Sequence, residues 1–93
     1  MSSRRKLKKY INLSMDLLYT DCMLYKIFVV NADRIAADKV IIKIAETHSD
    51  LIKRISASEG KEVKGRVNTY YKKLRADFVE QSNALAKEIA ALP

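Results

Sequence analysis

The most hydrophobic stretch of the chain runs from Leu13 to Val30. When this stretch is projected onto a helix, its apolar residues leave only a narrow polar strip that includes Asp16 and Thr20. A helix that is apolar on nearly every side has to be covered on nearly every side. Two further helices in a chain of 93 residues can cover only part of this segment, so we expect the fold to be arranged around it.

The spacing of apolar residues predicts a first helix over about 7–30. Apolar residues recur at three- and four-residue steps at Leu7, Ile11, Leu18, Cys22, Tyr25 and Val29. The basic run that precedes Leu7 is unfavourable beside the positive end of a helix dipole, so we expect residues 1–6 to form a flexible basic arm. Asn31 is a favourable N-cap, which predicts a tight corner at Val30 to Ala32.

Two further helices are predicted over about 32–56 and 61–91. The first of them is the cleanest amphipathic segment in the chain, and its apolar face consists of Ala37, Val40, Ile41, Ile44, His48, Leu51, Ile52 and Ile55. Parts of 27–30 and 40–44 also have the β-branched content of strands, but their apolar and polar residues do not alternate. The last helix carries a near-heptad apolar seam that Gln81 and Glu88 interrupt.

These segments predict an all-α fold, an up-down-up antiparallel three-helix bundle that forms a single domain over residues 1–93. The sequence contains only two glycines and one proline, which favours long helices. If the last helix starts directly beside the end of the second, Leu7 lies opposite Val63 and Cys22 lies opposite Phe78.

The same register places one polar layer inside the bundle. His48 falls beside Ser14 on one side and Tyr70 on the other. Buried polar groups in proteins are hydrogen-bonded, so we expect this histidine to be a satisfied side chain in the core.

The excess of apolar surface on 13–30 predicts that the chain pairs into a homodimer through its first helix. A domain of this size buries only about 60 to 65% of its unfolded surface, which also favours self-association. The residues that we expect at the interface are Met15, Tyr19, Met23 and Ile27. A helix of another protein, covering the same face, is the alternative occupant.

The charge distribution predicts a basic pole. The chain has 18 basic and 11 acidic residues, a net charge of +7. In the predicted bundle the starts of the first and third helices meet at one end, where we expect an anion-binding or nucleic-acid-binding surface made of Arg4, Arg5, Lys6, Lys8, Lys9, Lys61, Lys64 and Arg66. Its partner would be nucleic acid, an acidic protein or anionic lipid. A solvated surface that keeps an apolar protein in solution is the alternative interpretation.

No pattern of catalytic or metal-binding residues is present in the sequence. His48 is the only histidine, and no nucleophile or paired acid is placed to work with it. Carboxylates do not recur with it at the spacing that metal sites in helical bundles require. We therefore predict a non-enzymatic interaction module with no catalytic residue, metal, cofactor or small-molecule substrate.

The sequence favours a cytoplasmic protein without a transmembrane segment. The single cysteine, Cys22, has no partner for an internal disulfide, which suits a reducing compartment. Asp16 and Asp21 interrupt the apolar region that a secretory signal would need. Lys26 divides the longest apolar run, which is shorter than the about 20 residues of a membrane span.

Overall fold

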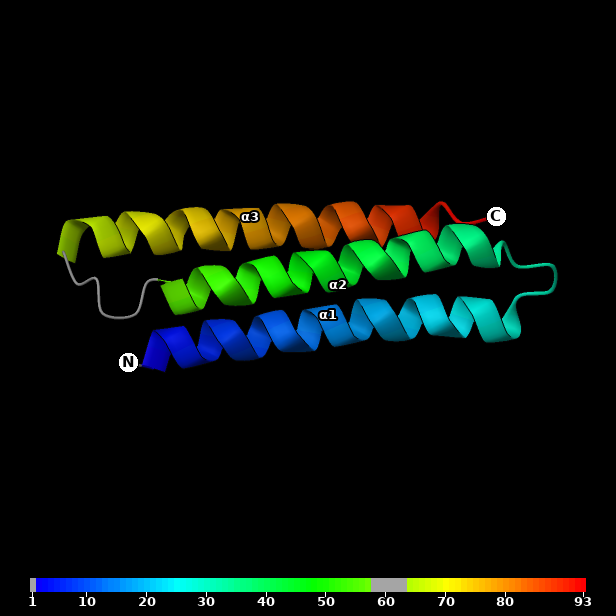
Figure 1. Ribbon diagram of the computed structural model, residues 1–93, viewed down its shortest axis with the longest axis horizontal. Coiled ribbons are helices and arrows are strands. Elements are labelled where there is room, and N and C mark those ends of the chain that lie inside the picture. Colours follow the sequence, from blue (N-terminus) through cyan, green and yellow to red (C-terminus); the bar gives the residue numbers. More distant parts are fainter. Residues whose placement is uncertain (1, 58–63) are drawn as a thin grey trace.

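Three long helices lie side by side in the computed structural model of the chain (Figure 1). Helix α1 spans Ser2–Phe28, α2 spans Arg34–Ala57 and α3 spans Lys64–Ala90. The structure describes residues 2–57 and 64–93, with the side chains of residues 5–56 and 69–93. No strand occurs in these residues, so the prediction of an all-α, three-helix fold is confirmed.

Contacts along α1 and α2 run in opposite order. Asn12 of α1 meets His48 near the middle of α2, whereas Cys22 near the end of α1 meets Ala37 near the start of α2. Figure 1 shows α3 alongside both helices, with its last residues beside the corner that joins α1 to α2. The molecule is accordingly elongated, with extents of 52 × 17 × 15 Å.

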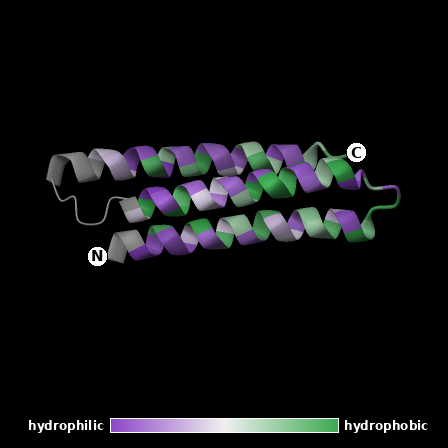
Figure 2. Cartoon of the chain, in the orientation of Figure 1, coloured by the Kyte–Doolittle hydropathy of each residue, from purple (hydrophilic) through white to green (hydrophobic). Residues whose placement is uncertain are grey.

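One face of α1 supplies a large share of the hydrophobic core. Hydrophobic residues recur along all three helices (Figure 2), and the buried ones are Leu7, Ile11, Met15, Leu18 and Cys22 of α1, Ala37, Val40, Ile44, Leu51 and Ile55 of α2, and Leu74 and Leu85 of α3. Within each helix they are separated by three, four, seven or eleven residues, which keeps them on a single helix face. Burying one such leucine or isoleucine contributes about 1.5–3 kcal/mol, so this seam is the main source of stability.

The corner between α1 and α2 is capped by a different residue from the one predicted. The side-chain oxygen of Asp33 accepts a hydrogen bond of 3.0 Å from the backbone N–H of Ala36, which makes Asp33 the N-cap of α2. Asn31, the predicted cap, has a φ of 60°. Asparagine tolerates this left-handed conformation, which is common just after a helix ends. The corner is therefore longer than predicted, from Val29 to Asp33.

Tyr25 ties the corner to the last residues of the chain. Its hydroxyl accepts a hydrogen bond of 2.7 Å from the backbone N–H of Asp33. The same hydroxyl donates a hydrogen bond of 2.8 Å to the backbone carbonyl of Pro93. One side chain thus connects the end of α1, the cap of α2 and the residues that follow α3.

The start of α1 also differs from the prediction. The helix begins at Ser2, so residues that we expected to form a flexible arm are part of its first turns. Extending a helix that already exists is far easier than nucleating one, and lysine and arginine are good helix formers. These two effects outweigh the unfavourable position of basic side chains beside the helix N-terminus.

Helix α3 is displaced along the bundle relative to the predicted register. Arg54 of α2 pairs with Asp77 at 2.9 Å, and Phe78 lines the same groove as Leu7 rather than packing opposite Cys22. The start of α3 therefore extends past the end of α2 (Figure 1). The prediction assumed that α3 begins directly beside the end of α2, and the position of Val63, which it placed opposite Leu7, lies outside the described residues.

Replacing Leu51 with alanine tests the core seam. Leu51 is fully buried, and removing a buried leucine side chain leaves a cavity, so we expect a loss of about 2–5 kcal/mol of unfolding free energy. Urea denaturation followed by circular dichroism, at one fixed protein concentration, measures it. The matched control is Ile42→Ala on the same helix, which is 59% exposed and should change stability by about 0.5 kcal/mol or less. Equal effects of the two substitutions would contradict this core.

Candidate functional site

The outer side of α1 carries a second apolar face. We call this face the α1 stripe; its residues are each 45–74% exposed, and they are Tyr10, Leu13, Leu17, Leu24, Ile27 and Phe28. Tyr10, Leu17 and Leu24 are seven residues apart, and Leu13 and Ile27 each follow one of them by three residues, as in the alternating three- and four-residue pattern. Helices that pair in coiled coils use this repeat. The stripe lies on the far side of α1 from the core seam, because the two sets use different positions of the helical turn.

The residues predicted for self-association only partly coincide with the stripe. Ile27 is 64% exposed and belongs to it, and Tyr19 is also exposed. Met23 is half-buried. Met15 is 1% exposed and packs in the core, so its assignment to the outer face was wrong. A helix that is apolar on nearly every side does not reveal which side its neighbours will cover, and the predicted face was rotated toward α2.

A cluster of exposed apolar residues lies at the corner end of the bundle. Val30 is 85% exposed, Phe28 and Ile35 are about three-quarters exposed, and Val29 is also exposed. In Figure 2 the ribbon has the hydrophobic colour where the chain leaves α1 and turns toward α2. Exposed apolar surface therefore continues beyond the stripe to the tip of the molecule.

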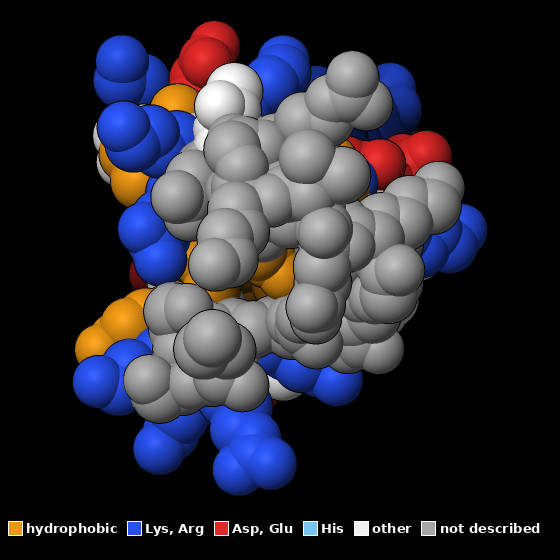
Figure 3. Space-filling view, turned by 90° about the vertical axis from the view of Figure 1, so that its left-hand side faces the viewer, with side chains coloured by type: hydrophobic (Ala, Val, Ile, Leu, Met, Phe, Trp, Pro, Cys, Tyr) orange, Lys and Arg blue, Asp and Glu red, His pale blue; other side chains and the backbone are white. Residues whose placement is uncertain are grey.

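Basic side chains gather at the opposite end. Figure 3 looks onto the end where α1 and α3 begin, and Lys and Arg side chains surround it with few Asp or Glu. Of the predicted set, the residues whose side chains are described are all exposed: Arg5, Lys6, Lys8 and Lys9. Lys61 lies outside the described residues, as do the side chains of Arg4, Lys64 and Arg66. We call Arg5, Lys6, Lys8, Lys9 and the exposed Arg75 of α3 the basic end.

A groove between α1 and α3 lies at the same end, and the sequence did not predict it. It is lined by Lys6, Leu7, Tyr10, Arg75, Phe78 and Val79. Its floor is apolar, and its two cations come from different helices. The groove depends on the register of α3, which the sequence pattern alone placed incorrectly.

The heptad repeat of Tyr10, Leu17 and Leu24, offset from the core seam, was the available signal for the stripe.

His48 is hydrogen-bonded, but not to the predicted partners. Its ring Nε2 lies 2.6 Å from the side-chain oxygen of Asn12, whereas Ser14 and Tyr70 were expected there. The Tyr70 hydroxyl instead donates a hydrogen bond of 2.6 Å to the backbone carbonyl of Arg54. The displaced register of α3 accounts for this, because it moves Tyr70 toward the end of α2. The imidazole is thus held by a neutral amide, a partner typical of a structural histidine.

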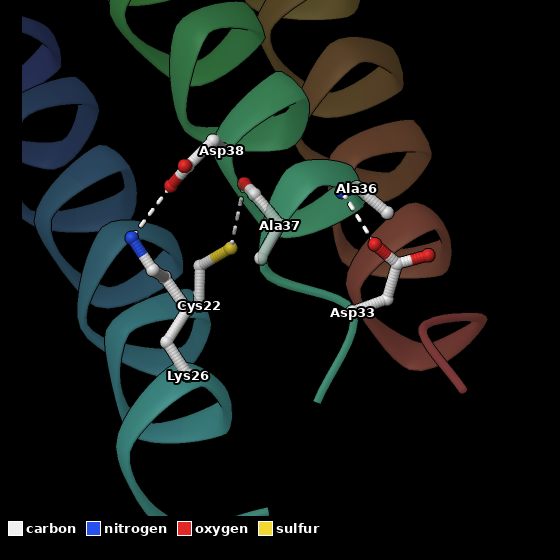
Figure 4. Close-up of polar contacts among 6 residues, drawn as sticks. All are labelled: Cys22, Lys26, Asp33, Ala36, Ala37 and Asp38. Atoms are coloured by element: carbon white, nitrogen blue, oxygen red, sulfur yellow. Dashed lines mark hydrogen bonds and ion pairs between the residues drawn. The ribbon is translucent and has the colours of Figure 1, made fainter. Parts of the chain in front are cut away.

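Cys22 is buried at the contact of α1 with α2. Its thiol donates a hydrogen bond of 3.3 Å to the carbonyl of Ala37, as Figure 4 shows. Burial raises the pKa of the thiol, the nearby Lys26 ammonium lowers it, and Asp38 raises it further. Lys26 and Asp38 form an ion pair of 2.5 Å beside it. Reactive cysteines have a lowered pKa and some exposure, so this thiol has the environment of a structural residue.

Within residues 2–57 and 64–93, no three His, Cys, Asp or Glu side chains are grouped so that they could hold a metal ion. None of the helices in the described parts of the chain combines the length and apolarity that crossing a bilayer requires.

No protein-family model matches the chain, and comparisons with curated proteins and with solved structures find no match.

The raised pKa of Cys22 predicts a specific dependence of stability on pH. The folded state holds the thiol proton more tightly than the unfolded chain does, so this contribution is complete below the ordinary thiol pKa and is lost as the pH rises through the folded value. We expect the stability difference between the natural chain and Cys22→Ala to be constant up to about pH 8 and to shrink between roughly pH 8 and pH 11, as the pH passes the ordinary thiol value of 9.0. Urea unfolding of both chains across this range measures it. A difference that stays constant would show that Cys22 does not have a raised pKa.

Proposed function

We propose that this chain is a non-enzymatic helical interaction module, folded as an up-down-up antiparallel bundle, which self-associates into a homodimer through the α1 stripe. The observation that carries the proposal is the stripe itself, six large apolar side chains on one helix that the chain's own bundle leaves 45–74% exposed. Contiguous apolar surface of this kind is rare on monomers and marks interaction sites. A second copy of α1 offers a matching repeat for it.

The chemistry of the described residues supports a non-enzymatic role. His48 is bound to Asn12, and Cys22 is buried with a raised pKa, so the two side chains most suited to acid-base or nucleophilic work are both in structural environments. We propose no metal, cofactor or small-molecule substrate. A reduced, buried cysteine also suits the cytoplasm, which we propose as the location.

A glutamate at the centre of the stripe tests the proposal. Leu17→Glu places a charge at the middle of the proposed interface, where desolvating it is unfavourable, so we expect the dimer to dissociate at micromolar concentration. Size-exclusion chromatography with light scattering measures the mass. The matched control is Ile42→Glu, because Ile42 is 59% exposed against 58% for Leu17 but lies on the outer side of α2. A natural chain that is monomeric at about 100 μM, well above the micromolar range of weak interfaces, rules the dimer out.

The same stripe could accept a helix of another protein, which is the alternative that the sequence left open. Co-purification followed by mass measurement separates the two cases. A natural chain that is monomeric alone and forms a defined complex with another protein favours hetero-association over the homodimer.

A second candidate function is nucleic-acid binding through the basic end. The observation that favours it is the group of exposed cations Arg5, Lys6, Lys8 and Lys9 on the first turns of α1, joined by Arg75 of α3. Lysine and arginine side chains grouped at one end of a helix bind phosphate backbones without reading base sequence. An acidic protein or an anionic lipid surface also carries negative charge and is the alternative anionic partner.

Salt dependence tests this second function. If the basic end neutralises about five phosphates, the logarithm of the association constant should fall with the logarithm of salt concentration at a slope of about −4.5. Fluorescence anisotropy with labelled duplex DNA and RNA measures it. Replacing Arg5, Lys6, Lys8 and Lys9 with glutamine should abolish binding, whereas Lys39→Gln with Lys87→Gln, exposed cations of the other end, should not. Absence of binding at low salt excludes the function.

A further inference from the structure

We propose that two copies of this chain pair their α1 stripes in antiparallel orientation, so that Phe28 of each copy enters the groove between α1 and α3 of the other. This inference rests on the proposed self-association and adds the orientation and register of the pair. Three features of the described surface support it: the charge along α1, the positions of the stripe residues and the match between the tip and the groove.

The charge along α1 is strongly uneven. Residues 2–14 contain five basic residues and no acidic one, whereas residues 15–28 contain Asp16, Asp21 and Lys26. A parallel pair would bring the two basic halves together, and like charges at that distance repel. An antiparallel pair places each basic half beside the half that carries the carboxylates. It also places the two helix dipoles side by side in opposite directions, an arrangement in which they attract each other.

The stripe itself matches best in the antiparallel direction. When two copies cross between residues 18 and 19, Tyr10 meets Ile27, Leu13 meets Leu24 and Leu17 meets Thr20, and twofold symmetry repeats each layer. Every exposed residue of the repeat is then covered.

The flanking positions discriminate further between the two orientations. In a parallel heptad pair, Asp16 would face Asp21 of the second copy, a repulsive pair that symmetry repeats. In the antiparallel register, Asp16 lies beside Met23 of the second copy and Asp21 beside Ser14, so the carboxylates are separated.

The tip of one copy fits the groove of the other. Phe28 follows Tyr10 by 18 residues, which is five helical turns, so both lie on the α3 side of the stripe. In the antiparallel register Phe28 reaches Leu7 of the second copy, and that residue lines the groove together with Tyr10, Phe78 and Val79. An aromatic ring there would cover the apolar floor, with Lys6 and Arg75 placed for cation–π contact.

Cysteine cross-linking distinguishes the orientations. In a Cys22→Ala background we place Tyr10→Cys on one chain and Ile27→Cys on another. A disulfide needs Cα atoms within about 7 Å, and in the antiparallel pair each position is about 25 Å along the axis from its own copy. We expect covalent dimers when the two variants are mixed and oxidised, and none from either variant alone. Non-reducing electrophoresis gives the result. Cross-linking of Tyr10→Cys with itself overturns the proposal.

A second measurement leaves the stripe intact. Spin labels on Lys8→Cys, again in the Cys22→Ala background, should lie on the order of 30 Å apart along the helix axis in the antiparallel pair. In a parallel pair they lie at the same level and report a much shorter distance. Double electron–electron resonance measures this separation, and a short distance contradicts the antiparallel pair even if cross-linking variants fail to fold.

A separate experiment tests whether Phe28 enters the groove of the second copy. Phe28→Ala should raise the dissociation constant of the dimer roughly tenfold or more, as for an aromatic anchor in a pocket. Val30→Ala, at a residue 85% exposed beyond the stripe, is the matched control and should have little effect. Equal effects overturn the insertion of Phe28.

Light scattering separates the two proposals. A dimer that fails the cross-linking and distance tests removes the antiparallel register and leaves self-association standing. A monomer at high concentration removes both.

Discussion

The contact between the inner face of α1 and α2 is the interaction on which the rest of the structure depends. Ile11, Met15 and Cys22 are almost completely buried there, and Leu51 of α2 packs in the same core. The two helices share more of the core than either shares with α3. Once this face is used, the described residues of the other two helices leave the outer face of α1 exposed, because a third helix can cover only one flank of the pair. The exposed stripe is a direct consequence of placing an all-round apolar helix in a bundle of three.

Helix α3 is held by a smaller set of contacts. Among the side chains of α3 that the structure describes, only Leu74 and Leu85 are buried, and Gln81 interrupts the seam between them. The side-chain oxygens of Gln81 and Ser82 are buried and have no hydrogen-bond partner among the described residues. Such groups oppose packing by about 1–3 kcal/mol each. The position of α3 along the bundle axis is therefore fixed by a few polar pairs, such as Arg54 with Asp77, as much as by its apolar seam.

The sequence predicted the helices better than their mutual positions. Apolar periodicity placed α1, α2 and α3 within a few residues, because burial on one face is a local pattern. The predicted register of α3 was wrong. The register depends on the distance that the chain covers between α2 and α3, and the apolar periodicity carries no information about that distance. The cap was assigned to Asn31 instead of Asp33, since both residues are good caps and only the corner geometry decides. Met15 was misassigned because α1 is apolar on both sides. The groove beside Phe78 was not predicted because it depends on the register of α3.

The Tyr25 hydroxyl affects the order of the corner between α1 and α2, which forms the tip of the molecule. With one bond to the cap of α2 and another to the carbonyl of Pro93, it braces the corner from two directions. The aromatic ring of Phe28 thus projects from a scaffold that is already ordered, not from a loose connection. A protruding group that is prearranged loses little freedom when it is captured, so more of its contact energy is retained as affinity. Removing the Tyr25 hydroxyl would leave the exposed apolar side chains at the corner chemically unchanged. It would still weaken their binding to a partner.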